Sequence, residues 1–144
     1  STRYATERVQ FGKPISAFQA IQHQLAQMAQ HTGSAVVSAE AAFAESNDQL
    51  AAWQIAAAKV CGAEAAGAVA AMAHAVHGAI GFTHEHALQQ GTRRLWAWRS
   101  EFGNLGHWAQ RLGRAVSQGG ATSLWPAVTA GHLAALSPSP VETP

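Results

Sequence analysis

The sequence predicts an all-α fold. Alanine, the strongest helix former, accounts for 33 of the 144 residues, and the β-branched residues that favour strands are scarce. Apolar residues recur at spacings of three and four along most of the chain, which is the periodicity of an amphipathic helix. Long helices joined by short connections are typical of an antiparallel up-and-down bundle. We therefore expect a four-helix bundle whose first helix is truncated.

The N-terminal third contains the end of one helix and the whole of the next. Residues 2–9 resemble the last turns of a helix. A break follows, because Gly12 permits a positive φ and Pro14 cannot continue a helix that precedes it. A helix is then predicted over about residues 16–45, where apolar residues define one helical face.

The central region predicts two more long helices. Ser46, Asn47 and Asp48 form an N-cap signal, so the next helix is expected from Asp48 to about residue 76. Residues 77–82 form a glycine-rich loop, and residues 83–86 could start a short helix. A longer helix is expected over about residues 92–117.

The predicted bundle domain covers residues 1–120 and ends at the glycine pair 119–120. Residues 121–144 form a tail that is compatible with one short helix near residues 123–136. The rest of this tail is expected to be disordered, since chain ends with serine and proline rarely pack.

Composition and charge exclude several classes of protein. The net charge is +1 and only 12% of residues are charged, against about 25% in ordinary domains, so much of the surface must be uncharged or covered by a partner. These values argue against a strongly basic nucleic-acid binder and an acidic disordered chain. The single cysteine, Cys61, excludes an intrachain disulfide and a thiolate metal cluster. It suits a reducing compartment.

No targeting or membrane segment is expected. The N-terminus lacks the apolar stretch of a signal peptide. The most apolar run, residues 63–82, contains Glu64, His74 and His77, so we interpret it as a packed core helix. These observations together predict a soluble, cytoplasmic protein.

Two segments carry residues suited to binding a phosphorylated aromatic ligand. The first, residues 4–15, reads YATERVQFGKPI and continues through residues 18–23. Its Arg8 can pair with a phosphate at two points, and Phe11 offers an apolar face to an aromatic ring. The second, residues 77–86, reads HGAIGFTHEH, and its backbone N–H groups can face a phosphate. From the residues alone, the favoured interpretation is a solvated Arg8 and a packed Phe11, because lone arginines near helix ends are common.

These two segments, in this order, resemble the C-terminal α-helical domain of acyl-CoA dehydrogenases over residues 3–117. The resemblance implies a longer subunit that also has an N-terminal helical and a middle β domain, so the chain is either a fragment of such an enzyme or a stand-alone module. It also implies that this domain contacts FAD bound mainly by a neighbouring subunit. The residues implied in that contact are Arg8, Gln10, Phe11, Ile15, Phe18, Ile21, His77, Gly78, Ala79 and Gly81.

The chain departs from the family pattern at four positions, one of which is Arg94, where the family usually has an aspartate. Ala75 replaces a glutamine and Ala79 replaces the second glycine of the loop. The position of the family's catalytic glutamate falls on Phe102, whereas Glu101 lies one residue earlier, a rotation of about 100° on a helix. Glu101 is the candidate catalytic base, and the alternatives are an ion pair with a nearby arginine (Arg93, Arg94 or Arg99), a base outside this chain, or no base at all.

The resemblance implies an acyl-CoA thioester as substrate, an electron-transfer flavoprotein as acceptor, and FAD as cofactor. It also implies a dimer or tetramer, homomeric or heteromeric. The alternative is a non-catalytic helical module for oligomerisation or regulation, which a missing base would favour. A metal site is not expected, because the histidines at 74, 77, 84 and 86 lack the HExxH spacing of zinc enzymes. Nucleic-acid binding is not expected either.

Overall fold

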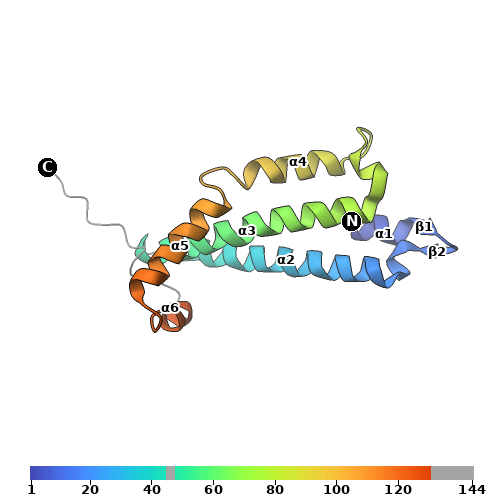
Figure 1. Ribbon diagram of the computed structural model, residues 1–144. Helices are drawn as coiled ribbons and strands as arrows, with labels where there is room; N and C mark the ends of the chain where they lie inside the picture. Colours follow the sequence, from blue (N-terminus) through green and yellow to red (C-terminus); the bar gives the residue numbers. More distant parts are fainter. Residues whose placement is uncertain (45–47, 131–144) are drawn as a thin grey trace.

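The computed structural model describes residues 1–44 and 48–130, and it confirms the all-α class. The α-helices are α1 (Thr2–Glu7), α2 (Gln19–Ala44), α3 (Asp48–His77), α4 (Leu88–Trp98), α5 (Leu105–Gly119) and α6 (Leu124–Ala130) (Figure 1). Two short 3₁₀ turns, η1 (Ile15–Ala17) and η2 (Gly78–Phe82), precede α2 and follow α3. A small antiparallel hairpin joins β1 (Val9–Gln10) to β2 (Lys13–Pro14), with Val9 opposite Pro14.

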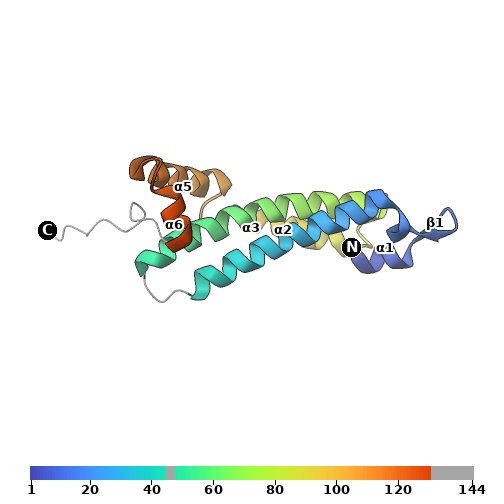
Figure 2. The same ribbon diagram turned by 90° about the horizontal axis from the view of Figure 1, so that it is seen from below.

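Helix α3 is the central element of the fold. It packs along α2 over most of its length and also contacts α4, α5, η2 and α1. Figures 1 and 2 show α2 and α3 side by side, with α1 and the hairpin at one end and with α5 and α6 at the other. The end of α3 therefore meets the N-terminal motif, although the two are about seventy residues apart in the sequence.

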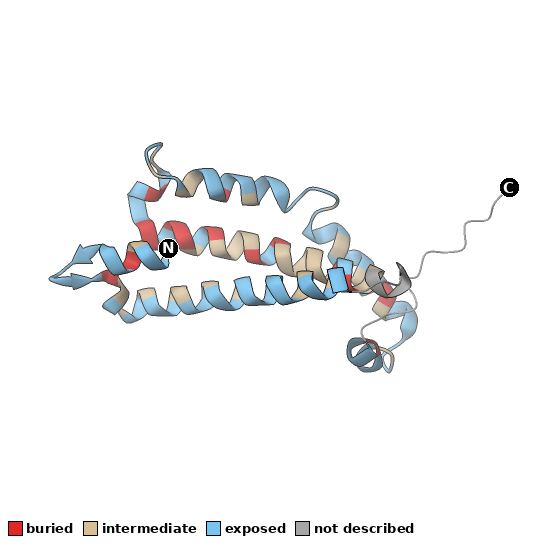
Figure 3. Ribbon diagram, turned by 180° about the vertical axis from the view of Figure 1, so that it is seen from behind, coloured by how far each residue is buried: buried red, intermediate tan, exposed pale blue. Residues whose placement is uncertain are grey.

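The core of the bundle consists mainly of alanine. Eight of the ten buried apolar residues are alanines, and among the described residues no large side chain is fully buried. The buried positions lie mostly along α3, while α2 has none (Figure 3). Small residues let helices approach closely, but they bury little apolar area, so much of the larger apolar surface stays exposed. This pattern is typical of a domain that is covered by a partner.

The predicted helix over residues 92–117 is wrong, because a loop interrupts it. Helix α4 ends at Trp98 and α5 begins at Leu105. Between them Phe102 and Gly103 adopt left-handed φ values of 55° and 100°, which no helix can contain. The Asn104 side chain then accepts a hydrogen bond of 2.9 Å from the His107 N–H and caps α5.

Two shorter predictions also need correction. Residues 83–86 do not start a helix, since α4 begins only at Leu88. The first helix ends at Glu7, and Val9 belongs to the hairpin. Phe11 and Gly12 both have positive φ at the hairpin tip, which is the pattern of a type I′ turn. Of the predicted C-terminal helix, α6 covers 124–130. The remainder of the tail and the cap residues 46–47 lie outside the described residues.

One segment, Ala52–Phe82, has the length and mean hydropathy of a helix that could cross a membrane. The central helix of a soluble bundle has the same properties, and this segment lies between α2, α4 and α5. Helix α3 is thus the central helix of the bundle, and 22% of its most apolar window is buried among the described residues.

Candidate functional site

A groove of about 530 Å³ lies where α1, the hairpin and the end of α3 meet. One wall comes from the N-terminal motif and the other from the last turn of α3 and η2. The lining residues are Tyr4, Arg8, Gln10, Phe11, Ile15, Phe18, Ile21, Ala75, Val76, His77, Gly78, Ala79 and Ile80. Nine of the ten residues predicted to contact a cofactor are in this list.

The N-terminal lobe, which we define as residues 1–18, is held on α3 by a small apolar cluster. Ala5 and Ile15 are buried together with Val76 of α3. Arg8 ends α1 in an extended conformation, and its carbonyl accepts a hydrogen bond of 2.9 Å from the Ile15 N–H. This bond closes the base of the hairpin, so that Arg8 and Phe11 are held on the same side of the lobe as the groove.

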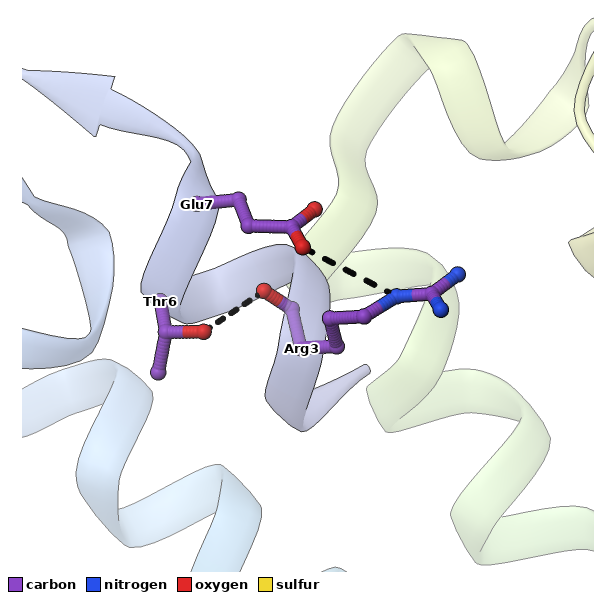
Figure 4. A network of polar contacts seen from close by, with 3 residues as sticks. All are labelled: Arg3, Thr6 and Glu7. Atoms are coloured by element: carbon purple, nitrogen blue, oxygen red, sulfur yellow. Dashed lines mark hydrogen bonds and ion pairs between the residues drawn. The ribbon is translucent and has the colours of Figure 1, made fainter.

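Three exposed residues of α1, Arg3, Thr6 and Glu7, contact one another (Figure 4). Arg3 Nε lies 3.9 Å from Glu7 Oε1, and the Thr6 hydroxyl donates to the Arg3 carbonyl at 2.8 Å. Both ends of this ion pair are mostly exposed, so its contribution to stability is small. The residues that attach the lobe to α3 are therefore the buried Ala5 and Ile15 and not this ion pair.

The wall formed by the lobe combines a cation with aromatic rings. The Arg8 side chain is exposed and, within the described residues, makes no ion pair. Phe11 is 91% exposed and has φ 51°, a left-handed conformation that is strained for a bulky residue. Its ring meets the Phe18 ring edge-on at 6.1 Å, and Lys13 Nζ lies 4.5 Å from the centre of Phe18. A free guanidinium beside aromatic and aliphatic surface suits a ligand with a phosphate and a flat ring.

The opposite wall is built around His77. Its Nδ1–H donates to the Ala73 carbonyl at 2.7 Å, and its ring stacks on Tyr4 at 4.3 Å. The Tyr4 hydroxyl in turn donates to the His77 carbonyl at 3.4 Å. Burial lowers the pKa of His77 below its ordinary value, and the charges of His86 and His74 act in the same direction, against the hydrogen bond to Ala73. Gly78 follows with φ 66°, which exposes its backbone to the groove.

Gly81 is the predicted site residue that does not line the groove. It is buried within η2, where a Cβ would lie 3.0 Å from Leu88 Cδ2 and 3.2 Å from His74 Nδ1. His74 is itself buried, lies 2.9 Å from the Thr92 hydroxyl through Nε2, and stacks on Phe82 at 4.2 Å. Gly81 therefore makes room for packing between α3 and α4.

Four lining residues were not singled out from the sequence as cofactor contacts. Three of them, Tyr4, Val76 and Ile80, lie within or next to the two motifs. Their position beside the motif residues was the only sequence feature that could have predicted that they line the groove. Ala75 was noted only as a departure from the family pattern, yet it also lines the groove.

Glu101 lies far from the groove. It is exposed on the α4–α5 loop, where its carbonyl accepts a 2.6 Å hydrogen bond from Lys59 Nζ. Lys59 precedes His77 by 18 residues on α3, which is about 27 Å along a helix. Among the described residues the Glu101 carboxylate makes no ion pair with Arg93, Arg94 or Arg99. A search of the described residues for three or more clustered metal ligands found none.

Comparison with known families identifies the class of protein. The family described as acyl-CoA dehydrogenase, C-terminal domain, matches residues 1–115, and this confirms the resemblance seen in the sequence. The chain therefore belongs to the acyl-CoA dehydrogenase family, whose full-length members are oxidoreductases. No curated protein and no solved structure gave a significant match.

Proposed function

We propose that this chain is the C-terminal bundle of an FAD-dependent acyl-CoA dehydrogenase, and that its groove binds the adenosine diphosphate part of FAD held mainly by a neighbouring subunit. The observation that carries the proposal is the convergence of the N-terminal motif and the residue 77–79 loop on one groove. Neither segment could form such a site alone.

The chemistry of the groove suits this part of the cofactor. The Arg8 guanidinium would pair with a phosphate, since it has two parallel N–H donors and no competing carboxylate among the described residues. Phe11, Phe18 and Ile21 would cover an aromatic or ribose face. The backbone at Gly78 would approach the ligand closely because it carries no side chain. When bound, FAD supplies the hydride acceptor for α,β-dehydrogenation.

The remaining chemistry requires groups outside the groove. The acyl-CoA α-proton must pass to a base, and Glu101 is the candidate on this chain. Because Glu101 contacts Lys59, which lies about 27 Å along α3 from His77, it could serve only a substrate bound at the α4–α5 end of the bundle. We propose an electron-transfer flavoprotein as the acceptor, on the family resemblance alone.

Subunit assembly is the second role that we propose for this domain. Large apolar side chains such as Phe43, Trp98 and Trp125 are exposed, as expected of surfaces that a partner covers. An apolar groove of about 460 Å³ between α2, α3 and α4 also opens beside Ser1. A helix that preceded residue 1 in a longer subunit would fill this groove and complete the bundle.

A non-catalytic helical module derived from the same fold is the alternative. The observation in its favour is the α4–α5 loop, where Phe102 occupies the position of the family's catalytic glutamate in a strained conformation. Ala75 and Ala79 in the groove point in the same direction. Such a module would assemble subunits or regulate them, and it would bind no flavin.

Replacing Arg8 by alanine in the full-length enzyme tests the proposal. We expect a lower flavin-to-protein ratio after purification and dilution, because the phosphate loses its cation. Arg8→Lys should restore only part of the loss, since lysine cannot pair at two points. Arg114→Ala on α5, another exposed arginine, is the matched control and should retain flavin. Unchanged flavin content in Arg8→Ala would refute the role of the groove.

A further inference from the structure

Three aromatic side chains join the N-terminal lobe to the end of α3. Tyr4 of α1 stacks on His77 at 4.3 Å with an angle of 24° between the rings. His86, from the turn before α4, meets His77 at 5.0 Å and Tyr4 at 6.2 Å, in both cases edge-on. Together with the Ala5, Ile15 and Val76 cluster, this group is the attachment of the lobe to α3. We call Tyr4, His77 and His86 the ring cluster.

The hydrogen bonds fit a neutral His77. Its Nδ1–H is directed to the Ala73 carbonyl, so a second proton would enter at Nε2. His77 is only 7% exposed, and among the described residues no acceptor is hydrogen-bonded to Nε2. A charged imidazole in this position would be hydrated only from the groove, so it would have fewer water contacts than in the unfolded chain.

The neighbouring groups do not compensate such a charge. From α1, the ring of Tyr4 faces His77; from the turn before α4, His86 faces it; and His74 lies on its own helix. His86 and His74 would each repel the added proton when charged. The Ala73 hydrogen bond and the face of Tyr4 favour a cation, but they are outweighed by burial, which lowers the pKa of His77.

We propose that His77 acts as a proton-sensitive latch, whose protonation releases the N-terminal lobe from α3 and thereby opens the groove. The lobe carries Arg8 and Phe11, whereas the opposite wall carries His77 and Gly78. Separation of the two walls would disperse the residues that converge on one ligand. The two walls of the groove therefore stay together while His77 is neutral and separate in acid. The consequence for flavin rests on the proposed function, but the latch itself does not.

The only tyrosine in the chain is Tyr4, which makes the latch directly observable. NMR spectra of the 144-residue protein without flavin would follow the ring signals of Tyr4 and His77 from about pH 8 to about pH 5. We expect both to change together, below the ordinary histidine pKa of 6.5. Over the same range, hydrogen exchange at the Arg8 and Ile15 amides should accelerate beyond its intrinsic pH dependence. Their hydrogen bonds lie within the lobe, and a helix of six residues with a short hairpin is not stable once it leaves α3.

Two variants separate His77 from its neighbours. His77→Phe keeps a ring against Tyr4 but cannot take up a proton, so the Tyr4 transition and the acid-dependent exchange should be lost. His84→Asn removes an exposed histidine outside the ring cluster and should leave both unchanged. If His77→Phe does not fold, the wild-type titration decides. A Tyr4 change that persists in His77→Phe, or that occurs without titration of His77, would overturn the latch. None of these measurements depends on flavin, so they can fail or succeed independently of the groove's ligand.

Discussion

Replacement of Gly81 by alanine tests the packing behind the groove. The glycine lies in η2, between the end of α3 and the start of α4. An added Cβ would lie 3.0 Å from Leu88 Cδ2, 3.1 Å from His77 Cβ and 3.2 Å from His74 Nδ1. All three distances are shorter than the 3.5–4.0 Å or so at which non-bonded carbon atoms attract each other most strongly.

The expected cost follows from which neighbours can move. The Leu88 methyl group is at the end of a flexible side chain and can rotate away. The His77 Cβ is fixed to the backbone, and the His74 ring is held by Thr92 and Phe82. Overpacking of this kind costs about 1–3 kcal/mol, and the reduced freedom of the unfolded chain returns about 0.4–1 kcal/mol. We therefore expect Gly81→Ala to lower the free energy of unfolding by about 1–2 kcal/mol.

Thermal unfolding followed by circular dichroism measures the effect, which should lower Tm by several degrees. Gly33→Ala is the matched control, because a Cβ at Gly33 on α2 meets nothing within 4 Å. In a helix interior that change should stabilise the protein by about 0.5–1 kcal/mol. If Gly81→Ala were as stable as Gly33→Ala, the close packing of η2 against His74 and His77 would be refuted.

Three further predictions concern the loop and pH. Asn104→Ala should lower the free energy of unfolding by about 1 kcal/mol, because the first turn of α5 loses its cap. Asn104→Asp keeps a capping oxygen and should not lower it. Equal stabilities of the alanine variant and the wild type in urea denaturation would refute the role of the cap. Phe102→Gly should raise the free energy of unfolding by about 1 kcal/mol, since glycine adopts the φ of 55° without strain. A decrease in the free energy of unfolding would contradict this, because it would mean that the 90% exposed ring packs against the protein in solution. Folding lowers the pKa of His77, so the unfolded chain binds the proton more tightly than the folded one. The free energy of unfolding should therefore be unaffected by His77 above pH 6.5 and should decrease as the pH falls below that value. Denaturation midpoints that do not fall across this range, or that fall equally in His77→Phe, would contradict this assignment.

The sequence was sufficient for the fold class, for the two longest helices and for most of the groove. Helices α2 and α3 have long apolar periodicity, so their bounds were predicted to within three residues at each end. The groove residues Arg8 to Ile21 are close in sequence, and the motif that contains them was recognisable as a unit. In both cases residues close together in the sequence determine the structure, so the sequence pattern alone was informative.

Features that depend on contacts between distant segments could not be predicted. Leu95, Trp98, Phe102 and Leu105 keep helical spacing across the α4–α5 loop, so periodicity alone extended one helix through it. The Gly103–Asn104 pair, a turn residue followed by a cap residue, was the signal for the break. The burial of Gly81 depends on His74 and Leu88, which come from different helices, and no spacing rule brings them together.

The intact mass and the absorption spectrum of the protein purified from its native host test the proposed function most directly. If the chain is the C-terminal bundle of an acyl-CoA dehydrogenase, the polypeptide that contains it should have a mass well above 15.1 kDa and should show the visible absorption bands of bound flavin. A polypeptide with the mass of the 144 residues alone and no flavin absorption would contradict that function and favour the stand-alone helical module.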